Sequence, residues 1–238
     1  MSALVSYSSD SESDKEPARK RRRVQLPSAT SALPCVDEER RGVWPSLVFV
    51  KVRVLRSDGL REFLVQLDDT WQLTDEEDYH VSLSHTFELR KHQIEGYVAA
   101  LRQQLRQLQP LSSASCAELR LCQTRVFSNP SETRDFAVVA HSRGIDTQGS
   151  DYESDDEETG ELEVDDWLVQ AVRLTDATLR KYEFAEFFQR PCWHLSVASR
   201  AKQGKVVLPK GSLDVRIQLQ KEVILRIGNR LFSVAKLY

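Results

Sequence analysis

A four-residue pattern, His-apolar-Ser-apolar, occurs twice in this chain and limits the folds available to it more than any other feature. The first copy begins at His80 and the second at His194, 114 residues further on. In a β-strand, residues i and i+2 point to the same face. Each copy therefore predicts a strand that places an imidazole beside a hydroxyl, His80 with Ser82 and His194 with Ser196, while the apolar residues between them pack into the core.

Two imidazoles of this kind suit transfer at a phosphodiester. The neutral one takes a proton from the attacking oxygen, and the protonated one gives a proton to the leaving oxygen. Both forms are accessible near neutral pH because the unperturbed pKa of histidine is about 6.5. The hydroxyls of Ser82 and Ser196 can donate hydrogen bonds to the nonbridging phosphate oxygens, where charge accumulates. We predict that His80 and His194 are catalytic; the pattern does not say which is the base.

A single His-x-Ser strand is more often structural, with its histidine satisfied in the core. Two copies, each directly after an aromatic residue (Tyr79 and Trp193), favour catalysis instead. The arrangement needs neither a metal ion nor another cofactor, and the four cysteines show no paired spacing typical of a zinc site.

Strongly charged segments flank and interrupt the predicted fold, although the net charge is only −3. Residues 1–40 are polar and poor in large apolar groups, so we expect a disordered tail. Within it, the basic run Arg19, Lys20, Arg21, Arg22 and Arg23 predicts a nuclear localisation signal; the alternative is an arm that touches RNA nonspecifically. The acidic segment 146–163 is predicted to be a solvated loop. No apolar run is long enough to cross a membrane.

Residues 41–238 are predicted to form one α+β domain with two lobes, because strands and helices come in two similar batches. The apolar periodicities predict strands over 47–55, 79–84, 118–127, 134–140 and 193–199, and helices over 60–68, 89–109 and 164–182. A final hairpin is predicted around the turn Gly228-Asn229.

Four stretches carry a family resemblance: MSALVSYSSDSESD, YHVSLSHTFELRKHQIEGYVAAL, FAEFFQRPCWHLSVA and GNRLFSVAKLY. With them the chain resembles the U6 small nuclear RNA phosphodiesterases, within the two-histidine phosphoesterase superfamily. The resemblance implies two lobes related by a pseudo-twofold axis, with antiparallel sheets lining a central groove and helices outside.

The resemblance also implies an activity: a metal-independent 3′-to-5′ RNA exonuclease that trims the uridine or adenosine tail of U6 RNA in the nucleus, here predicted to be an oligouridylate tail. Nothing in the sequence suggests more than a monomer. The 2′-hydroxyl of the penultimate nucleotide attacks the adjacent phosphate, which leaves a 2′,3′-cyclic phosphate or, after ring opening, a 3′-phosphate. Phe188 matches an aromatic position, often tyrosine, that stacks against the terminal base. The segment 200–212 is shorter than the helix that the family pattern leads us to expect there.

Two other functions remain open at this level. One is a 2′,3′-cyclic phosphodiesterase that only opens preformed cyclic RNA ends with the same four residues. The other is a noncatalytic nuclear RNA-binding protein, in which the two motifs are relics.

Overall fold

The computed structural model describes residues 42–111, 117–129, 131–141, 159–188, 191–204, 206–209 and 211–237, with the side chains of 159–163 left aside. The predicted tail, its basic run and residues 146–158 of the acidic segment lie outside these ranges. Residues 159–163, predicted as the end of the acidic loop, instead belong to a helix that starts at Thr159.

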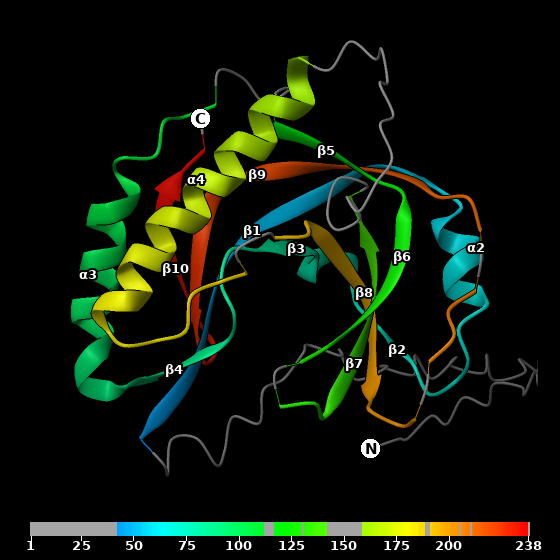
Figure 1. Ribbon diagram of the computed structural model, residues 1–238, viewed down its shortest axis with the longest axis horizontal. Coiled ribbons are helices and arrows are strands. Elements are labelled where there is room, and N and C mark those ends of the chain that lie inside the picture. Colours follow the sequence, from blue (N-terminus) through cyan, green and yellow to red (C-terminus); the bar gives the residue numbers. More distant parts are fainter. Residues whose placement is uncertain are drawn as a thin grey trace, which may run out of the picture.

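Two antiparallel sheets form the body of the molecule (Figure 1). The larger follows the order β10-β9-β1-β3, with β4 also paired to β1 and β5 to β9. Its strands are β1 (Val43–Asp58), β3 (His80–Ser82), β4 (Phe87–Arg90), β5 (Glu118–Leu121), β9 (Asp214–Ile227) and β10 (Arg230–Lys236). The smaller follows the order β2-β8-β7-β6, with β2 (Gln72–Leu73), β6 (Gln123–Ser128), β7 (Arg134–Ala140) and β8 (His194–Ala201). The predicted α+β class with antiparallel sheets is confirmed.

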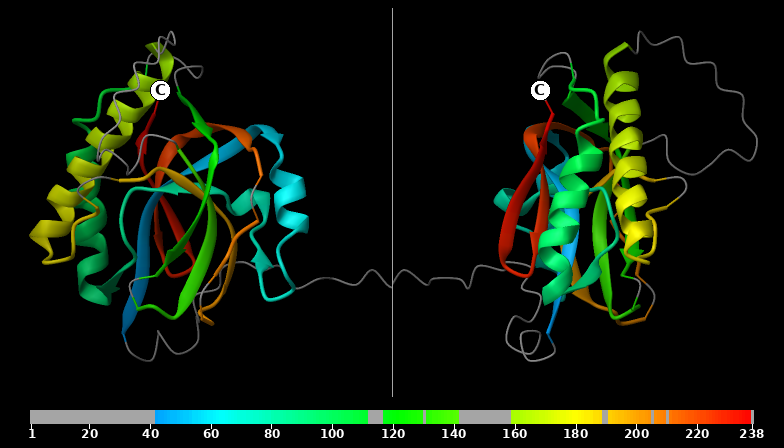
Figure 2. Two further views of the ribbon diagram at one scale, coloured as in Figure 1. Left: turned by 45° about the vertical axis from the view of Figure 1, so that its right-hand side comes forward. Right: turned by 90° about the vertical axis from the view of Figure 1, so that its left-hand side faces the viewer.

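Three α-helices are described: α2 (Leu60–Val65), α3 (Ile94–Leu105) and α4 (Thr159–Lys181). Helices α3 and α4 pack against each other on the side of the larger sheet, and α2 lies on the opposite side of the molecule (Figures 1 and 2). The helix predicted over 89–109 is shorter, because β4 and a 3-10 turn (Lys91–Gln93) take its first residues. A second 3-10 turn (Glu76–Asp78) precedes the first motif. In the described part of 200–212 no helix forms, as predicted.

The core lies between the helices and the apolar faces of both sheets. On β3, buried Val81 lies between the partly exposed His80 and Ser82. Val81 packs in the same cluster as Val48 of β1 and Tyr97 and Leu101 of α3. The predicted C-terminal hairpin is confirmed: β9 and β10 meet at Gly228, whose φ of 54° is the left-handed conformation that this turn requires. Each motif strand is thus held by pairing with a neighbour, β3 with β1 and β8 with β7.

Candidate active site

The first motif lies on β3, which pairs with β1 through Phe49↔Ser82 and Lys51↔His80. His80 and Ser82 share one face and remain partly exposed, while Val81 between them is buried. The predicted side-by-side placement of imidazole and hydroxyl is therefore present at this strand.

The second motif lies on β8 and has the same layout. His194 pairs with Ala140 of β7, and Ser196 pairs with Val138. Both motif side chains are partly exposed, whereas Leu195 is fully buried behind them.

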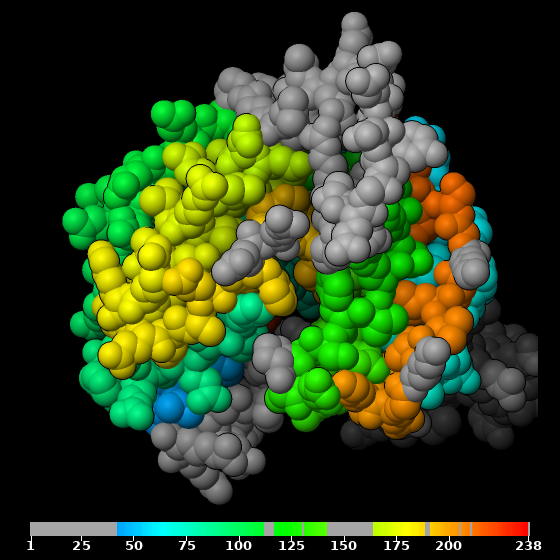
Figure 3. Space-filling model, in the orientation of Figure 1, coloured from blue at the N-terminus to red at the C-terminus, as the bar shows by residue number. Residues whose placement is uncertain are grey.

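The two motif strands lie against each other although they belong to different sheets. The surface is hollowed between the end of α4, drawn in yellow, and the green strands β6 and β7 (Figure 3). His80 and His194 are near enough for the charge of one to act on the pKa of the other. The fold thus brings together two histidines that the sequence separates by 114 residues.

Matching hydrogen bonds fix the tautomer of both imidazoles. Nδ1 of His80 lies 2.7 Å from the carbonyl oxygen of Asp78, and Nδ1 of His194 lies 2.7 Å from that of Cys192. A carbonyl oxygen only accepts, so each Nδ1 carries the proton and each neutral Nε2 keeps a free lone pair. Each Nε2 is therefore the atom that can take up or deliver a proton.

An aromatic ring packs against each imidazole. Phe49 of β1 lies 4.9 Å from His80 between ring centroids, and Phe127 of β6 lies 4.8 Å from His194. The pKa of His80 is lowered to about 4, mainly by burial and further by the charges of Arg226 and His194, whereas the hydrogen bond to the carbonyl of Asp78 opposes the shift. Burial also lowers the pKa of His194, against the hydrogen bond to Cys192.

The serines of the motifs differ in their surroundings. Neither the hydroxyl of Ser82 nor that of Ser196 forms a hydrogen bond to another described residue, so both hydroxyls can donate to a ligand. Ser84, two residues further along, is buried, and its oxygen accepts a hydrogen bond of 2.9 Å from the backbone N–H of Val48. Ser84 therefore serves the fold, not the site.

Phe188 is 58% exposed and contacts the edge of His85 at 4.3 Å between centroids. Its neighbour Phe187 is buried and donates its backbone N–H to Asp176 at 2.8 Å, which anchors this segment after α4. The exposed ring of Phe188 thus lies against His85, which follows His80 by five residues in the sequence.

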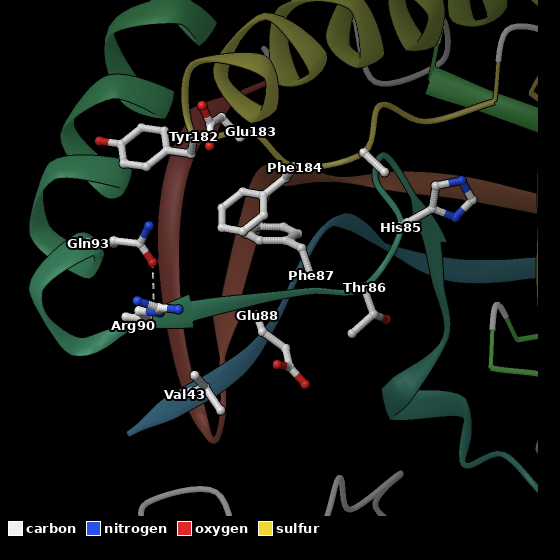
Figure 4. Close-up of a pocket in the computed structure, with 11 residues that line it drawn as sticks. Val43, His85, Thr86, Phe87, Glu88, Arg90, Gln93, Tyr182, Glu183 and Phe184 are labelled. Carbon is white, nitrogen blue, oxygen red and sulfur yellow. Dashed lines mark hydrogen bonds between the residues drawn. The ribbon is translucent and has the colours of Figure 1, made fainter. Parts of the chain in front are cut away.

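A pocket of about 650 Å³ lies beside this aromatic pair, between β4 and the end of α4 (Figure 4). The rings of Phe87 and Phe184 lie next to each other in it, tilted by 40° with their centroids 5.0 Å apart, and the backbone N–H of Arg90 donates to Gln93. Neither motif histidine lines it.

Arg226 of β9 is a site residue that the sequence did not indicate. Its guanidinium lies 5.9 Å from the Phe49 ring centroid, and its charge acts on His80. It is one of several cations in the C-terminal hairpin, and only the pairing of β9 with β1 singles it out.

Among the described residues, His, Cys, Asp and Glu form no group of three or more arranged to hold a metal ion. Within the same ranges, no helix is both long and apolar enough to cross a membrane.

Two His-x-Ser strands that lie against each other on an antiparallel α+β scaffold are the arrangement that the sequence predicted for a two-histidine phosphoesterase. The chain belongs to the HVSL family, described as "Uncharacterised conserved protein", whose model matches residues 4–235. It is similar to U6 snRNA phosphodiesterase 1 of Xenopus laevis, with 26% identity over 230 residues, 82% of this chain and 78% of that protein.

It is also similar to U6 snRNA phosphodiesterase 1 of Danio rerio, with 27% identity over 126 residues, 53% of this chain and 36% of that protein. Among solved structures, it is similar to Usb1 of Kluyveromyces marxianus, with a TM-score of 0.46, 14% identity and coverage of 82% of this chain and 98% of that one. The family resemblance predicted from the sequence is confirmed.

Proposed function

We propose that this chain is a nuclear 3′-to-5′ RNA exonuclease that shortens the oligouridylate 3′ end of U6 RNA by transesterification. The observation that carries the proposal is the pair of imidazoles with matched tautomers, each with Nδ1 tied to a carbonyl and Nε2 free. The similarity to the two U6 snRNA phosphodiesterases supports the choice of substrate.

The reaction follows from these atoms. The Nε2 lone pair of one histidine removes the proton of the penultimate 2′-hydroxyl as its oxygen attacks the adjacent phosphorus. The other histidine is protonated at Nε2 and gives its own Nε2 proton to the 5′ oxygen of the departing nucleoside as the P–O bond breaks. The RNA keeps a 2′,3′-cyclic phosphate, and ring opening by water gives a 3′-phosphate. Ser82 and Ser196 donate to the nonbridging oxygens.

Substrate binding prepares the acid. Both imidazoles have lowered pKa values in the free protein, so neither holds a proton readily at neutral pH. A phosphodiester anion seated between them favours the charged form of the histidine that it contacts. The exposed ring of Phe188 is proposed to stack on the terminal base, an interaction worth about 1–3 kcal/mol.

The test is a gel assay on an oligouridylate with a 3′-hydroxyl in the presence of EDTA. The wild type is expected to shorten it stepwise, and His80→Ala and His194→Ala are each expected to lose about 10²–10⁴-fold in rate. His92→Ala is the matched control, because His92 is exposed on the 3-10 turn before α3. Cleavage only of a preformed 2′,3′-cyclic end would favour the cyclic phosphodiesterase, and binding without cleavage would favour the noncatalytic alternative.

The same proposal places the protein in the nucleus as a monomer that binds RNA. Alanine replacement of Arg19, Lys20, Arg21, Arg22 and Arg23 is expected to disperse a fluorescent fusion into the cytoplasm without changing exonuclease activity in vitro. A lower activity in vitro would instead assign the run to RNA binding.

A further inference from the structure

Arg226 lies on the same face of the larger sheet as the first motif. It pairs with Leu47 of β1, and Phe49, two residues on, pairs with Ser82 of β3. Its guanidinium lies 5.9 Å from the Phe49 ring centroid, and the same ring lies 4.9 Å from His80. The ring of Phe49 therefore lies next to both Arg226 and His80.

The guanidinium of Arg226 has no hydrogen-bond or ion-pair partner among the described residues. Its Nε atom is inaccessible and unpaired, and burial lowers the pKa of the group, with only the charge of Asp78 acting in the opposite sense. A partly buried cation left without a partner is costly, and such groups normally bind an anion.

Arg200, another arginine whose buried Nε forms no hydrogen bond, shows what a structural role looks like in this fold. It pairs with buried Asp135 at 3.8 Å, donates to the backbone carbonyl of Gln203 and lies 4.8 Å from the Trp71 ring centroid. Its charge is thus compensated by the protein, whereas that of Arg226 is not.

The positive charge of Arg226 acts on His80, beside which the phosphate of a substrate would bind. Arg226 influences His80 more strongly than His194 does, although His194 is the proposed partner of His80 across the substrate. Because Arg226 and His80 both lie near the Phe49 ring on one face of the sheet, a phosphate held at the imidazoles would lie close to the guanidinium, whose planar fork of donors matches phosphate oxygens.

We propose that Arg226 binds a nonbridging oxygen of the scissile phosphate and is a fifth residue of the active site. This inference rests on the proposed function. The guanidinium offsets the negative charge that builds up on the phosphate as the 2′-oxygen attacks. Before substrate binds, burial and the charge of Arg226 together keep His80 neutral. The bound phosphate then balances the positive charges of Arg226 and of protonated His80.

Three variants separate this role from a structural one. Arg226→Met keeps the length of the side chain without the charge, and Arg226→Lys keeps the charge without the fork. Arg230→Met is the matched control, because Arg230 begins the next strand of the same hairpin and is exposed. We expect Arg226→Met to lower kcat/KM on oligouridylate about 10- to 100-fold, as for a hydrogen bond to a charged group. Arg226→Lys is expected to recover part of this loss, and Arg230→Met to change kcat/KM less than about twofold.

Binding to an uncleavable ligand identifies the phosphate. The ligand is an oligouridylate with a 2′-deoxy penultimate nucleotide, carrying at its last linkage either phosphate or uncharged methylphosphonate. For the wild type, methylphosphonate is expected to weaken binding about tenfold or more. For Arg226→Met the loss is expected to be about twofold or less, because the guanidinium that would pair with the phosphate charge is already absent. The His80 pKa, followed by NMR, is expected to rise in Arg226→Met, because a cation that opposes protonation of His80 is gone; this checks that the two groups lie close together in the folded protein.

An equal methylphosphonate effect in wild type and Arg226→Met would overturn the inference, as would an unchanged kcat/KM in a cleaving enzyme. Coupling at the penultimate linkage in place of the last would also overturn it, because the phosphate bound would not be the scissile one. Failure of the wild type to cleave any RNA would refute the proposed function itself, so the two failures are distinguishable. If Arg226→Met does not fold, Arg226→Gln, which also removes the charge but keeps a polar side chain, takes its place in the same cycle and is expected to show the same reduced methylphosphonate effect.

Discussion

The pH dependence of catalysis tests the electrostatics of the two imidazoles directly. Burial, together with the charges of Arg226 and His194, lowers the pKa of His80 to about 4, and burial lowers that of His194 below its usual 6.5. The reaction needs one imidazole protonated and the other neutral. We therefore expect kcat/KM, which reports the free enzyme, to have its maximum on the acid side of neutrality.

The magnitude follows from the two pKa values. The form with a single proton on the pair is most abundant between the two pKa values, both of which lie below the usual 6.5. Above both values this form falls about tenfold for each pH unit, and at pH 7 about one free molecule in a thousand carries a proton on His80. Bound phosphate raises the pKa of the imidazole it contacts, so kcat is expected to peak at higher pH than kcat/KM.

The assay is the initial rate of oligouridylate shortening between pH 4.5 and 8 at constant ionic strength, beside an NMR titration of the histidine ring protons. A kcat/KM maximum at or above pH 6.5 would refute the reasoning, because it would mean that burial does not depress the two pKa values. Arg226→Met is expected to move the acid limb upward, since the cation that opposes protonation of His80 is gone.

Stability is expected to change over the same range. A lowered imidazole pKa means that the folded state binds fewer protons than the unfolded state between about pH 4 and 6.5. The contribution of His80 is thus fully present above pH 6.5 and declines as the pH falls toward about 4. Urea denaturation at each pH measures this decline and defines the range in which the rate data refer to folded protein; stability that rises on acidification would contradict the assignment.

Three further substitutions test individual contacts. Ser84→Ala removes the acceptor for the backbone N–H of Val48 and is expected to lower the free energy of unfolding by about 1–3 kcal/mol in urea denaturation, with kcat/KM of the folded fraction unchanged; a large loss of kcat/KM would place Ser84 in the site. Phe188→Ala is expected to weaken binding of uncleavable oligouridylate by about 1–3 kcal/mol without a stability change, because its ring is 58% exposed; equal binding would exclude stacking. Gly59→Ala is expected to lower the melting temperature measured by circular dichroism, because Gly59 has a φ of 74° and an added Cβ would lie 2.3 Å from the carbonyl oxygen of Ser212; an unchanged melting temperature would show that the turn can relax.

The face that each motif presents could be predicted without a structure, because it depends only on residues that are neighbours in the sequence. Alternation along a strand fixes that His80 shares a face with Ser82, and His194 with Ser196, whatever the strands pair with. The hairpin at Gly228 was equally local, since the turn residues specify it. Helix boundaries were less accurate: Thr159–Lys181 begins inside the predicted acidic loop, and β4 replaces the predicted start of the helix over 89–109. An amphipathic period marks the middle of a helix better than its ends.

By itself, then, the sequence predicted the four motif side chains as the site and determined which face of each strand holds them. Only the tertiary structure decided that the two strands meet, that each Nδ1 finds a carbonyl, and that burial lowers both imidazole pKa values. It also decided that Arg226 reaches Phe49, through a pairing of strands whose residues lie far apart in the chain. The physical reason is that alternation sets the face of a residue, whereas its neighbours depend on strand order and register, which arise from packing of the whole core.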